Sequence, residues 1–413
     1  MSKPRLLFIA PLMPGNGGNG LALRSGFFLD AFQRDHDVDL VVLPLAGDLR
    51  ETAFAQARCR RIEVIPVPSV LDAHASLIMR VTDPVARAEA WERYPRPSIY
   101  CFNPGTAWRA LIDRIDPFAY DLIHVQRLFC APLIDPLLKR ADRPPVLLDL
   151  DDDETESYAR LAALHARRGD APQARIAAAD ARKFVALADL YFPSVERVLV
   201  CSDHDRAQLG KRYPTAHFVC VPNVPPPPGS PPGGLRKPTD LLLVGNLSFL
   251  PNTDAAEWLV HEVLPRLDGV TATLVGSRIA EVDHLAEENP SVRVTGRVDD
   301  LSPYYAGARV AVAPLRTGGG TRIKILEAFS YGVPVVATRQ GAEGLDVQDG
   351  VHILIADEAA DFAAQCRRLL DDEALARTLS RNAGEWLKQH AMREAISDGI
   401  RRLAEDLRRS ARI

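Results

Sequence analysis

Proline and glycine crowd into one segment near the middle of the chain and divide it in two. That segment is Val221 to Gly234, VPNVPPPPGSPPGG. Proline at this density can neither continue a helix nor pair in a central strand, so we expect an exposed linker. The 413 residues also exceed what one hydrophobic core usually supports. We therefore expect two domains, 1–220 and 236–395, joined by a linker over 221–235. A final amphipathic helix, 396–413, must pack somewhere, and the N-terminal domain is a candidate.

Short apolar runs alternate with segments of helical spacing in both halves. Strands that are apolar throughout are typical of parallel sheets covered by helices on both faces. The predicted fold class is α/β, with two Rossmann-like domains whose parallel sheets face an interdomain cleft, where open α/β sheets bind ligands. The runs are Leu6–Ala10, Val38–Leu43, Ile62–Val67, Leu122–Val125, Val146–Leu150 and Arg197–Cys201, then Leu241–Val244, Ala272–Val275, Val292–Thr295, Val310–Ala313, Val333–Ala337 and Ile353–Ile355.

Composition narrows the class of protein. Hydrophobic residues make up 47% and charged residues 25% of the chain, and the net charge of -4 gives no reason to expect nucleic acid as a partner. The six cysteines show no paired spacing and no clustering with histidines, which favours a reducing compartment and argues against a zinc site. No stretch approaches the roughly 18 apolar residues of a membrane span. We expect a cytoplasmic protein, or at most peripheral contact with the inner membrane surface.

The stretch from Thr317 to Thr338, TGGGTRIKILEAFSYGVPVVAT, predicts a phosphate site. A turn at Gly318 to Gly320 precedes a helical pattern over Arg322 to Tyr331. Unpaired N–H groups at a helix start, together with the helix dipole, attract anions, and glycines let a ligand approach the backbone. Glu327 lies one turn beyond the cations of this segment, where a ribose diol would find a carboxylate. The alternative is an ordinary βαβ unit whose glycines only turn the chain.

The second half resembles glycosyltransferase family four, the retaining glycosyl transferase group 1 enzymes of GT-B fold, in a bacterial subgroup. The resemblance runs in order from Asp240 to about Leu387, through LLLVGNLSFLPNTDAAEWL, TLVGS, VRVTGRVDDLSPYYAGARVAVAPL, the glycine-rich stretch and GAEGLDVQDGVHILIADEAADFAAQCRRLL. The first half is similar more loosely, through PLMPGNGGNGLALRSGFFLDAF, DLIHVQRLFCAPL and VLLDLDDDETESY.

The resemblance implies a donor site with two departures from the family pattern. Glu327 matches the second glutamate of the paired-glutamate motif, which binds the donor ribose, whereas Gly319 stands where the first belongs. The family commonly places an arginine and a lysine after the first strand of this domain, and here that loop holds Asn246 and Asn252. A diphosphate leaving group needs cations, so we expect Arg322 and Lys324 to replace the missing pair as catalytic residues. Their alternative is a solvent-facing helix side chain.

Further residues follow from position in the resembling enzymes. His124 matches a histidine that faces the donor sugar from the N-terminal domain and is expected to be catalytic, although a histidine in an apolar strand is more often part of the core. No metal is expected. The expected donor-binding residues are Glu327, Gly318, Gly319, Gly320, Thr321, Gly296, Arg297, Val298, Gly245, Asn246, Gly17, Gly18 and Arg24.

Four aspartates follow one predicted strand, at positions 149, 151, 152 and 153. They are expected to cap a helix or to lie on the acceptor side. Their spacing also matches the metal-binding pair of GT-A glycosyltransferases. The nucleotide-site signals lie after the linker, however, which favours the first interpretation.

The predicted function is transfer of a sugar, with retained anomeric configuration, from a nucleotide-diphosphate sugar to a hydroxyl acceptor. Glycoconjugate or polysaccharide synthesis is the expected setting, with a saccharide, lipid-linked saccharide or small molecule as acceptor. The nucleotide sugar is a co-substrate, and no cofactor is expected. The alternatives are a GT-B nucleotide-sugar 2-epimerase and a nucleotide-sugar-binding protein without activity, which Gly319 would favour.

One basic segment is ambiguous. Leu71 to Trp108 mixes apolar residues with Arg80, Arg87, Arg93 and Arg96. Such a segment rests on anionic lipid or shapes an acceptor pocket. A solvated amphipathic helical segment is the commoner explanation.

Overall fold

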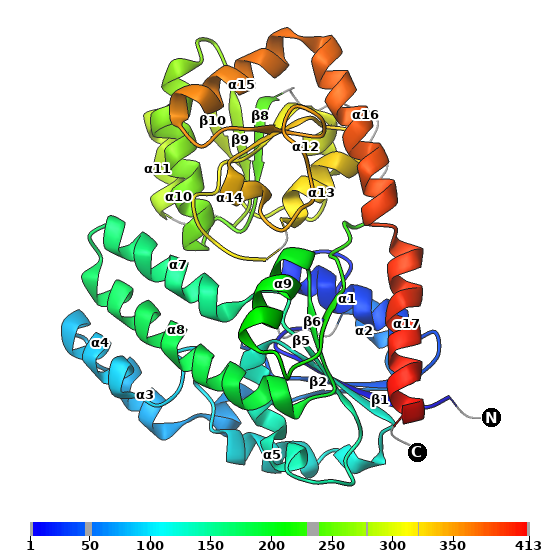
Figure 1. Ribbon diagram of the computed structural model, residues 1–413. Coiled ribbons are helices and arrows are strands. Elements are labelled where there is room, and N and C mark those ends of the chain that lie inside the picture. Colours follow the sequence, from blue (N-terminus) through cyan, green and yellow to red (C-terminus); the bar gives the residue numbers. More distant parts are fainter. Residues whose placement is uncertain (1–2, 46–51, 229–238, 278–279, 321, 411–413) are drawn as a thin grey trace. The chain divides into compact units, whose positions relative to one another are not determined.

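A computed structural model describes residues 3–45, 52–228, 239–277, 280–320 and 322–410. The chain forms two compact units (Figure 1). The first comprises Met1–Pro222 and Arg393–Ile413, and the second comprises Asn223–Met392. Much of the predicted linker, as well as Thr321, lies outside the described residues.

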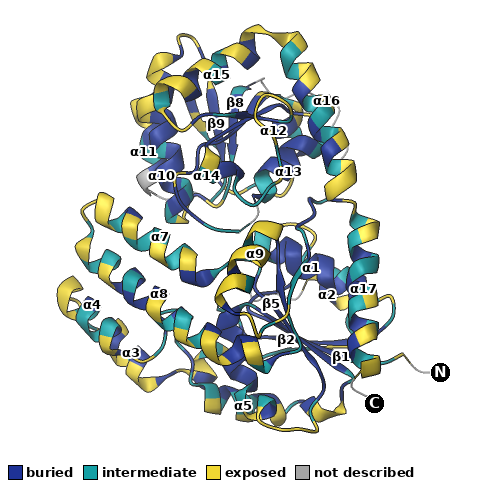
Figure 2. Cartoon of the chain, viewed as in Figure 1, coloured by how far each residue is buried: buried dark blue, intermediate teal, exposed yellow. Residues whose placement is uncertain are grey.

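A parallel sheet of seven strands forms the centre of the first unit in the described part of the chain. Its order is β3-β2-β1-β4-β5-β6-β7, and every pair is parallel. The five inner strands are largely buried, as Figure 2 shows, because most of their side chains are apolar and helices cover the sheet, whereas the edge strands β3 and β7 are only partly buried. They are β1 (Arg5–Ala10), β2 (Asp37–Val42), β3 (Arg61–Val64), β4 (Leu122–Gln126), β5 (Val146–Asp149), β6 (Arg197–Val200) and β7 (Phe218–Cys220).

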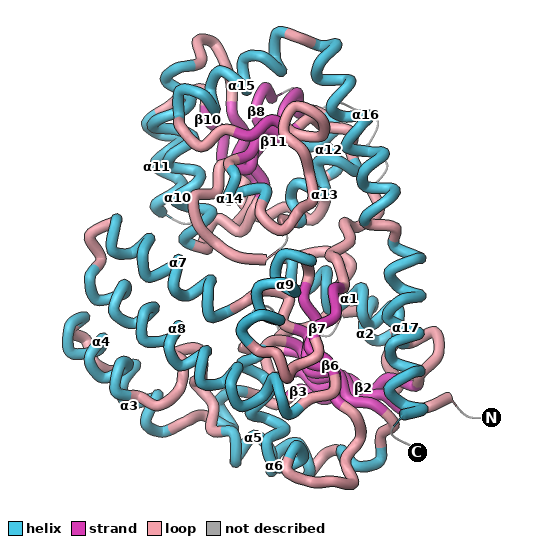
Figure 3. The backbone as a smooth tube through the Cα atoms, in the orientation of Figure 1, coloured by secondary structure: helices cyan, strands magenta, loops and turns pink. Residues whose placement is uncertain are grey.

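The second unit has a parallel sheet of six described strands in the order β10-β9-β8-β11-β12-β13. Figure 3 shows the strands of both sheets in magenta. The prediction of two parallel α/β sheets is therefore confirmed. The cleft expected between the domains stays a prediction. The strands are β8 (Thr239–Val244), β9 (Ala272–Val275), β10 (Val292–Val294), β11 (Ala308–Ala313), β12 (Val335–Ala337) and β13 (Leu354–Ile355).

Two strand predictions differ from the structure for local reasons. The run predicted over Ile62–Val67 ends as a strand at Val64, because Pro66 has no N–H for a ladder and precedes a 3-10 turn at Val67–Val70. β7 was not predicted, because three residues ahead of the proline-rich segment give too short an apolar signal.

Helices cover the two sheets. In the first unit they are α1 (Gly20–Phe32), α2 (Ala53–Gln56), α3 (Ala73–Met79), α4 (Pro84–Arg93), α5 (Pro104–Ile112), α6 (Asp135–Leu138), α7 (Glu154–Arg167), α8 (Ala171–Tyr191) and α9 (Asp203–Arg212). In the second they are α10 (Leu250–Trp258), α11 (Ala280–Glu288), α12 (Ser302–Ala306), α13 (Ile323–Ser330), α14 (Arg339–Ala342), α15 (Ala359–Asp371) and α16 (Glu373–His390). Among the described residues, no helix combines the length and apolar character needed to cross a bilayer.

The last helix, α17 (Arg393–Ser410), returns to the first unit and packs along α1 (Figure 1). Ile400, Ala404 and Leu407 form its buried stripe, as the amphipathic pattern requires. Ion pairs flank the stripe, with Arg401 bound to Asp35 through both carboxylate oxygens at 2.5 and 2.9 Å. The first unit is therefore completed by the end of the chain.

Candidate active site

Three loops meet at the C-terminal edge of the second sheet. The strand order reverses between β8 and β11, and ligands of open α/β sheets bind at such a point. The loops after β8, β9 and β10 contain Gly245, Gly276 and Gly296. A Cβ atom on Gly276 would lie 1.7 Å from the carbonyl oxygen of Gly245, and the N–H of Gly276 donates to Gly296 at 3.3 Å. Backbone therefore packs on backbone here, and only glycine fits at position 276.

The glycine-rich loop after β11 is held from inside by an arginine. Gly318 and Gly320 have φ of 114° and 71°, the left-handed region that glycine adopts at low cost. The buried guanidinium of Arg322 donates to the carbonyl of Gly318 at 2.9 Å, to that of Gly319, and to that of Gln340 at 3.3 Å. Arg322 therefore holds the loop in one conformation. In the structure, this residue, which was predicted to bind the diphosphate, lies inside the loop and contacts its carbonyls.

The same contacts orient two N–H donors. In a trans peptide the N–H points opposite to the carbonyl, so the N–H groups of Gly319 and Gly320 point away from the guanidinium of Arg322. No described residue accepts a hydrogen bond from either group. Both lie just before the N-terminus of α13, whose first turn has no side-chain cap. Unpaired N–H groups arranged in this way form an anion-binding site.

Lys324 lies on α13 beside the loop after β8. Its Nζ donates to Oδ1 of Asn252 at 2.8 Å, and Nδ2 of Asn252 donates to the carbonyl of Asn246 at 2.8 Å. The second bond fixes which end of the amide faces the lysine. Nζ would lie 3.1 Å from a Cβ on Gly245, so glycine leaves room for it. Burial, and then the charge of Arg322, lower the pKa of Lys324 to about 7.

Glu327 is the buried carboxylate of the site. It lies on α13 one turn after Lys324 and accepts a hydrogen bond from the hydroxyl of Tyr305 at 3.2 Å. Burial raises the pKa of Glu327 to about 7, against the lowering effects of Tyr305 and Lys324. The Tyr305 ring stacks on Tyr331, with centroids 4.9 Å apart and planes 8° apart. These aromatic contacts position the carboxylate.

An ion pair that spacing could not reveal supports the site. Arg316, on the loop after β11, binds both oxygens of Asp254 on α10 at 3.0 and 2.6 Å. It ties α10, and with it Asn252, to the glycine-rich loop. Sequence reasoning also missed Tyr305 and Gly276. The signal for Gly276 was present, because all three neighbouring strands are followed by glycine, in LLLVG, TLVG and VRVTG.

The remaining predicted residues of the second unit border this region. Gly245, Asn246 and Gly296 lie in the loops just described. Arg297 is exposed, and Val298 is half buried against the core cluster that contains Ile325 of α13. The structure therefore brings the second-unit donor residues to one sheet edge, except Thr321, which lies outside the described residues. Their role in binding stays a prediction.

The predicted residues of the first unit lie at its own sheet edge or in its core. Gly17 and Gly18 are exposed in the loop after β1. Arg24 is fully buried, donates to both oxygens of Asp149 and binds the carbonyl of Val221 at 2.9 Å. It therefore positions β5 and the chain after β7, and its guanidinium already has a carboxylate partner.

His124 occupies a closed aromatic cage. Its ring lies 4.5 to 5.2 Å from the ring centroids of Phe8, Phe28 and Phe32, and the residue has no exposed surface. Burial, with the nearby charge of Arg24, lowers the pKa of His124 to about 3. The imidazole is therefore neutral, and no part of it is exposed to a ligand in this arrangement. This placement agrees with the alternative stated above, that His124 is part of the core.

The aspartates at the end of β5 and just after it either pair with an arginine or cap a helix. Asp149 pairs with Arg24, and Asp153 is the N-cap of α7, where it accepts the N–H of Thr155 at 2.9 Å. Asp152 accepts the hydroxyl of Ser157 at 2.7 Å. Capping was expected from the run of carboxylates before a helical segment.

The two sheets are shared with solved structures of one fold. The chain superposes over nearly its whole length on solved glycosyltransferases of GT-B fold. For sucrose-phosphate synthase of Thermosynechococcus elongatus the TM-score is 0.68 at 19% identity, over 98% of this chain and 99% of that one. For an Anabaena protein solved with UDP and glucose it is 0.64 at 16% identity, over 98% and 100%. The fold is therefore GT-B, as predicted.

One region of the chain matches a family model. Residues 238–372 match the model described as Glycosyl transferases group 1, which confirms the resemblance stated above. A lipopolysaccharide core biosynthesis glycosyltransferase of Rhizobium meliloti is 31% identical over 150 residues, 34% of this chain and 44% of that protein. The chain thus matches less than half the length of this curated relative.

Replacing Gly276 tests the backbone contact below the site. Gly276→Ala places a methyl group against the carbonyl of Gly245, so the β8 loop must shift. We expect a loss of about 1–3 kcal/mol of unfolding free energy, measured by thermal or denaturant unfolding. Gly384→Ala on α16 is the matched control, because a Cβ there meets nothing within 4 Å. The control should gain about 0.5–1 kcal/mol. Equal stability of both variants would contradict the contact.

Proposed function

We propose that the protein transfers a sugar from a nucleotide-diphosphate sugar to a hydroxyl acceptor, with retention of the anomeric configuration. The observation that carries the proposal is the convergence of Lys324, Glu327 and the glycine-rich loop at the switch point of the second sheet. The group 1 family match of the same region supports it. So does the Anabaena protein of the same fold, which was solved with UDP and with UDP-glucose.

In this proposal, different groups of the cluster contact different parts of the donor. The N–H groups of Gly319 and Gly320 and the ammonium of Lys324 bind the diphosphate, because all are donors beside a helix N-terminus. Glu327 accepts hydrogen bonds from the ribose hydroxyls, which its contact with Tyr305 orients it to do. Arg322 acts through the loop that it holds, as a positioning residue.

The chemical step exchanges one bond at the anomeric carbon for another. The acceptor oxygen forms its bond on the face from which the diphosphate departs, and the carbon–oxygen bond to the β-phosphate breaks. The acceptor proton passes to an oxygen of the leaving diphosphate. Lys324 and the two N–H groups stabilise the charge that grows on that group, and they need no reorganisation during the step. No dedicated protein base is required, and transfer should persist without an added divalent ion.

Gly319 bears on the rival functions. A glutamate at that position would contact the transferred sugar in the resembling enzymes, and glycine offers only its backbone. This favours a site that recognises the nucleotide more strongly than the sugar. It also keeps an inactive nucleotide-sugar-binding protein as the alternative that a specific residue supports.

A donor screen tests the proposal. We expect one or more of the uridine, guanosine and adenosine diphosphate sugars to raise the melting temperature and to be hydrolysed slowly without acceptor. With saccharide acceptors, NMR of the product should show the anomeric configuration of the donor. Donor isomerisation without acceptor would identify a 2-epimerase. Binding without turnover would identify the inactive protein, and binding of no nucleotide sugar would overturn the proposal.

Donor affinity should depend on pH through Lys324 and Glu327. The diphosphate diester does not titrate near neutrality. Lys324 has a pKa of about 7 in the free site, so above this pH binding must take up a proton and affinity falls. Glu327 also has a pKa of about 7, so below this pH its carboxylate is lost and affinity again falls. Calorimetric titration with nucleotide sugar should therefore show an optimum near pH 7.

Two variants test which residue causes the acidic and the alkaline limb of that pH profile. Lys324→Met should lower affinity and remove the alkaline limb, whereas Glu327→Gln should remove the acidic limb. Each limb has a slope of at most about tenfold per pH unit. A flat profile for the parent between about pH 6 and about pH 9 would contradict the assignment.

The proposal includes peripheral contact with an anionic membrane through the tip where α3 meets α4. Leu77, Met79 and Val85 expose 63%, 49% and 54% of their surface there. Arg80 and Arg87 flank them, and neither forms an ion pair with a described residue. On the neighbouring helix α8, by contrast, Arg182 forms an ion pair with Glu92 of α4 at 3.3 Å. Apolar side chains ringed by unpaired cations suit anionic lipid.

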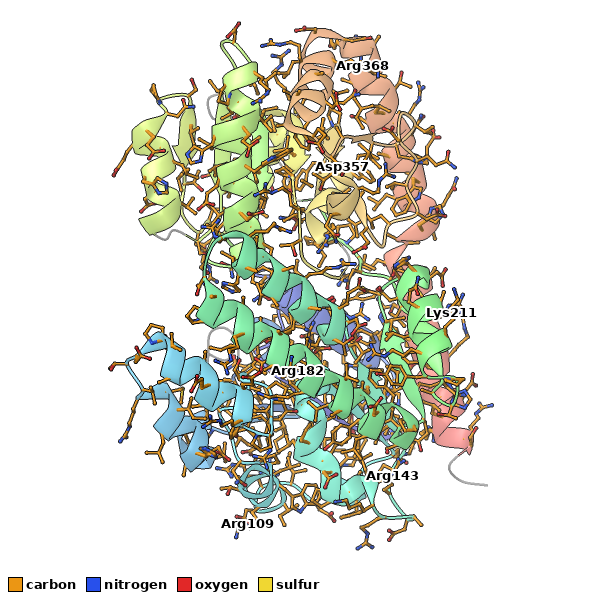
Figure 4. All side chains as sticks on the ribbon, turned by 60° about the vertical axis from the view of Figure 1, so that its left-hand side comes forward. Arg109, Arg143, Arg182, Lys211, Asp357 and Arg368 are labelled. Carbon is orange, nitrogen blue, oxygen red and sulfur yellow. The ribbon has the colours of Figure 1, made fainter. Side chains whose placement is uncertain are left out.

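Vesicle binding tests this surface. Met79→Ser/Arg80→Ser/Val85→Ser should reduce co-sedimentation with vesicles of about 30% phosphatidylglycerol by about fivefold or more, since each arginine contributes about 1 kcal/mol. The matched control is Arg109→Ser/Ile112→Ser on α5, which removes an exposed arginine, labelled in Figure 4, and an exposed apolar residue. Equal loss in both variants, or equal binding to neutral vesicles, would contradict the contact. A raised KM for a water-soluble acceptor without vesicle binding would indicate an acceptor pocket.

A further inference from the structure

Two histidines and a glutamate converge on the outer face of the second unit. His284 and Glu288 lie one turn apart on α11, and His261 lies on the segment that continues α10. Nε2 of His261 is 3.1 Å from Oε2 of Glu288, and the two imidazole centroids are 6.5 Å apart. One side-chain donor atom from each residue lies within 4.8 Å of those of the other two.

Buried apolar contacts hold together the two elements that carry these residues. The segment Leu259–Val263 has π-helical hydrogen bonding, a rare turn that is often found at functional sites. Its Leu259 and Val263 share a buried cluster with Val282 and Leu285 of α11. The core therefore locks the two elements together, while the three polar side chains stand on the rim above it. Ligands held on packed helices need little reordering when an ion binds.

We propose that His261, His284 and Glu288 form a binding site for a divalent ion of the zinc class. Two imidazoles and one carboxylate form a ligand set that zinc accepts, with a water molecule in the fourth position. Tetrahedral zinc with bonds of about 2.0–2.2 Å needs donors about 3.4 Å apart, close to the separation of His261 and Glu288. The donor atom of His284 lies within 4.8 Å of the other two and must move closer to complete the set.

The donor set also excludes other ions. Magnesium and calcium prefer all-oxygen ligands, so two imidazoles select against them. About half of the surface of His261 and of Glu288 is exposed, which leaves the ion a path from solvent. Bound zinc would join the π-helical segment to α11 and stabilise the second unit. This site does not depend on the proposed transferase activity, since none of its residues belongs to the donor cluster.

Zinc binding to the full chain tests the site without nucleotide sugar. We expect zinc chloride to raise the melting temperature by about 3 °C or more at saturation. Magnesium chloride should have no such effect. His261→Gln, His284→Gln and Glu288→Gln should each weaken zinc binding on the order of tenfold or more in calorimetric titration. All three residues are at least partly exposed, so the variants should fold.

Matched controls separate this site from general surface binding. Glu287→Gln removes the same charge from the same turn of α11 and should bind zinc as the parent does. His204→Gln, an exposed histidine of the first unit, should behave likewise. Cobalt should bind without the charge-transfer band of thiolate ligands, which separates the site from the cysteines. Absence of zinc stabilisation in the parent, or equal affinity in the parent and the histidine variants, would overturn the proposal.

Discussion

The conformation of the glycine-rich loop depends on the contact between the guanidinium of Arg322 and the carbonyls of that loop. A glycine-rich loop has many accessible conformations, and fixing them costs backbone entropy. Charge-assisted bonds to Gly318 and Gly319 select one conformation and turn the intervening N–H groups outward. The glycines therefore allow the loop to adopt this conformation, and Arg322 stabilises it. Arg322, which was predicted to bind the diphosphate, contacts the carbonyls of its own loop, and its part in donor binding stays a prediction.

Close packing makes room for the second cation. Gly245 leaves space for Nζ of Lys324, Gly276 keeps the carbonyl of Gly245 in place, and Asn252 accepts from the ammonium. A lysine and a glutamate near their point of half-ionisation at neutral pH make this region responsive to ligand charge. A diphosphate beside Lys324 and ribose hydroxyls beside Glu327 would favour the charged forms that burial disfavours, so binding would be coupled to proton uptake at Lys324 and proton release at Glu327.

Local patterns were sufficient to predict the architecture but not the contacts. The parallel strands could be predicted because they are apolar throughout, and the loop–helix–strand series because glycine and helical spacing adjoin in the sequence. The direction of Arg322 could not, since a side chain at a helix start is free to face solvent, ligand or loop. Lys324 meets Asn252 across 72 positions, and Arg316 meets Asp254 across 62. The histidines at 261 and 284 escaped notice for the same reason, because only folding brings their helices together. For His124 the sequence left two interpretations open, because an apolar strand most often buries a histidine in the core, whereas its position in the resembling enzymes suggests catalysis.

The return of α17 to the first unit affects how the protein is made. Residues on both sides of the second unit belong to the first unit, so the second unit is inserted within it in sequence terms. During synthesis the second unit has all its residues before α17 leaves the ribosome, whereas the face of α1 that α17 covers stays exposed until α17 is made. The apolar stripe of Ile400, Ala404 and Leu407 covers that face. Termination before α17 would thus leave the second unit with all its residues but the first unit with an exposed apolar face.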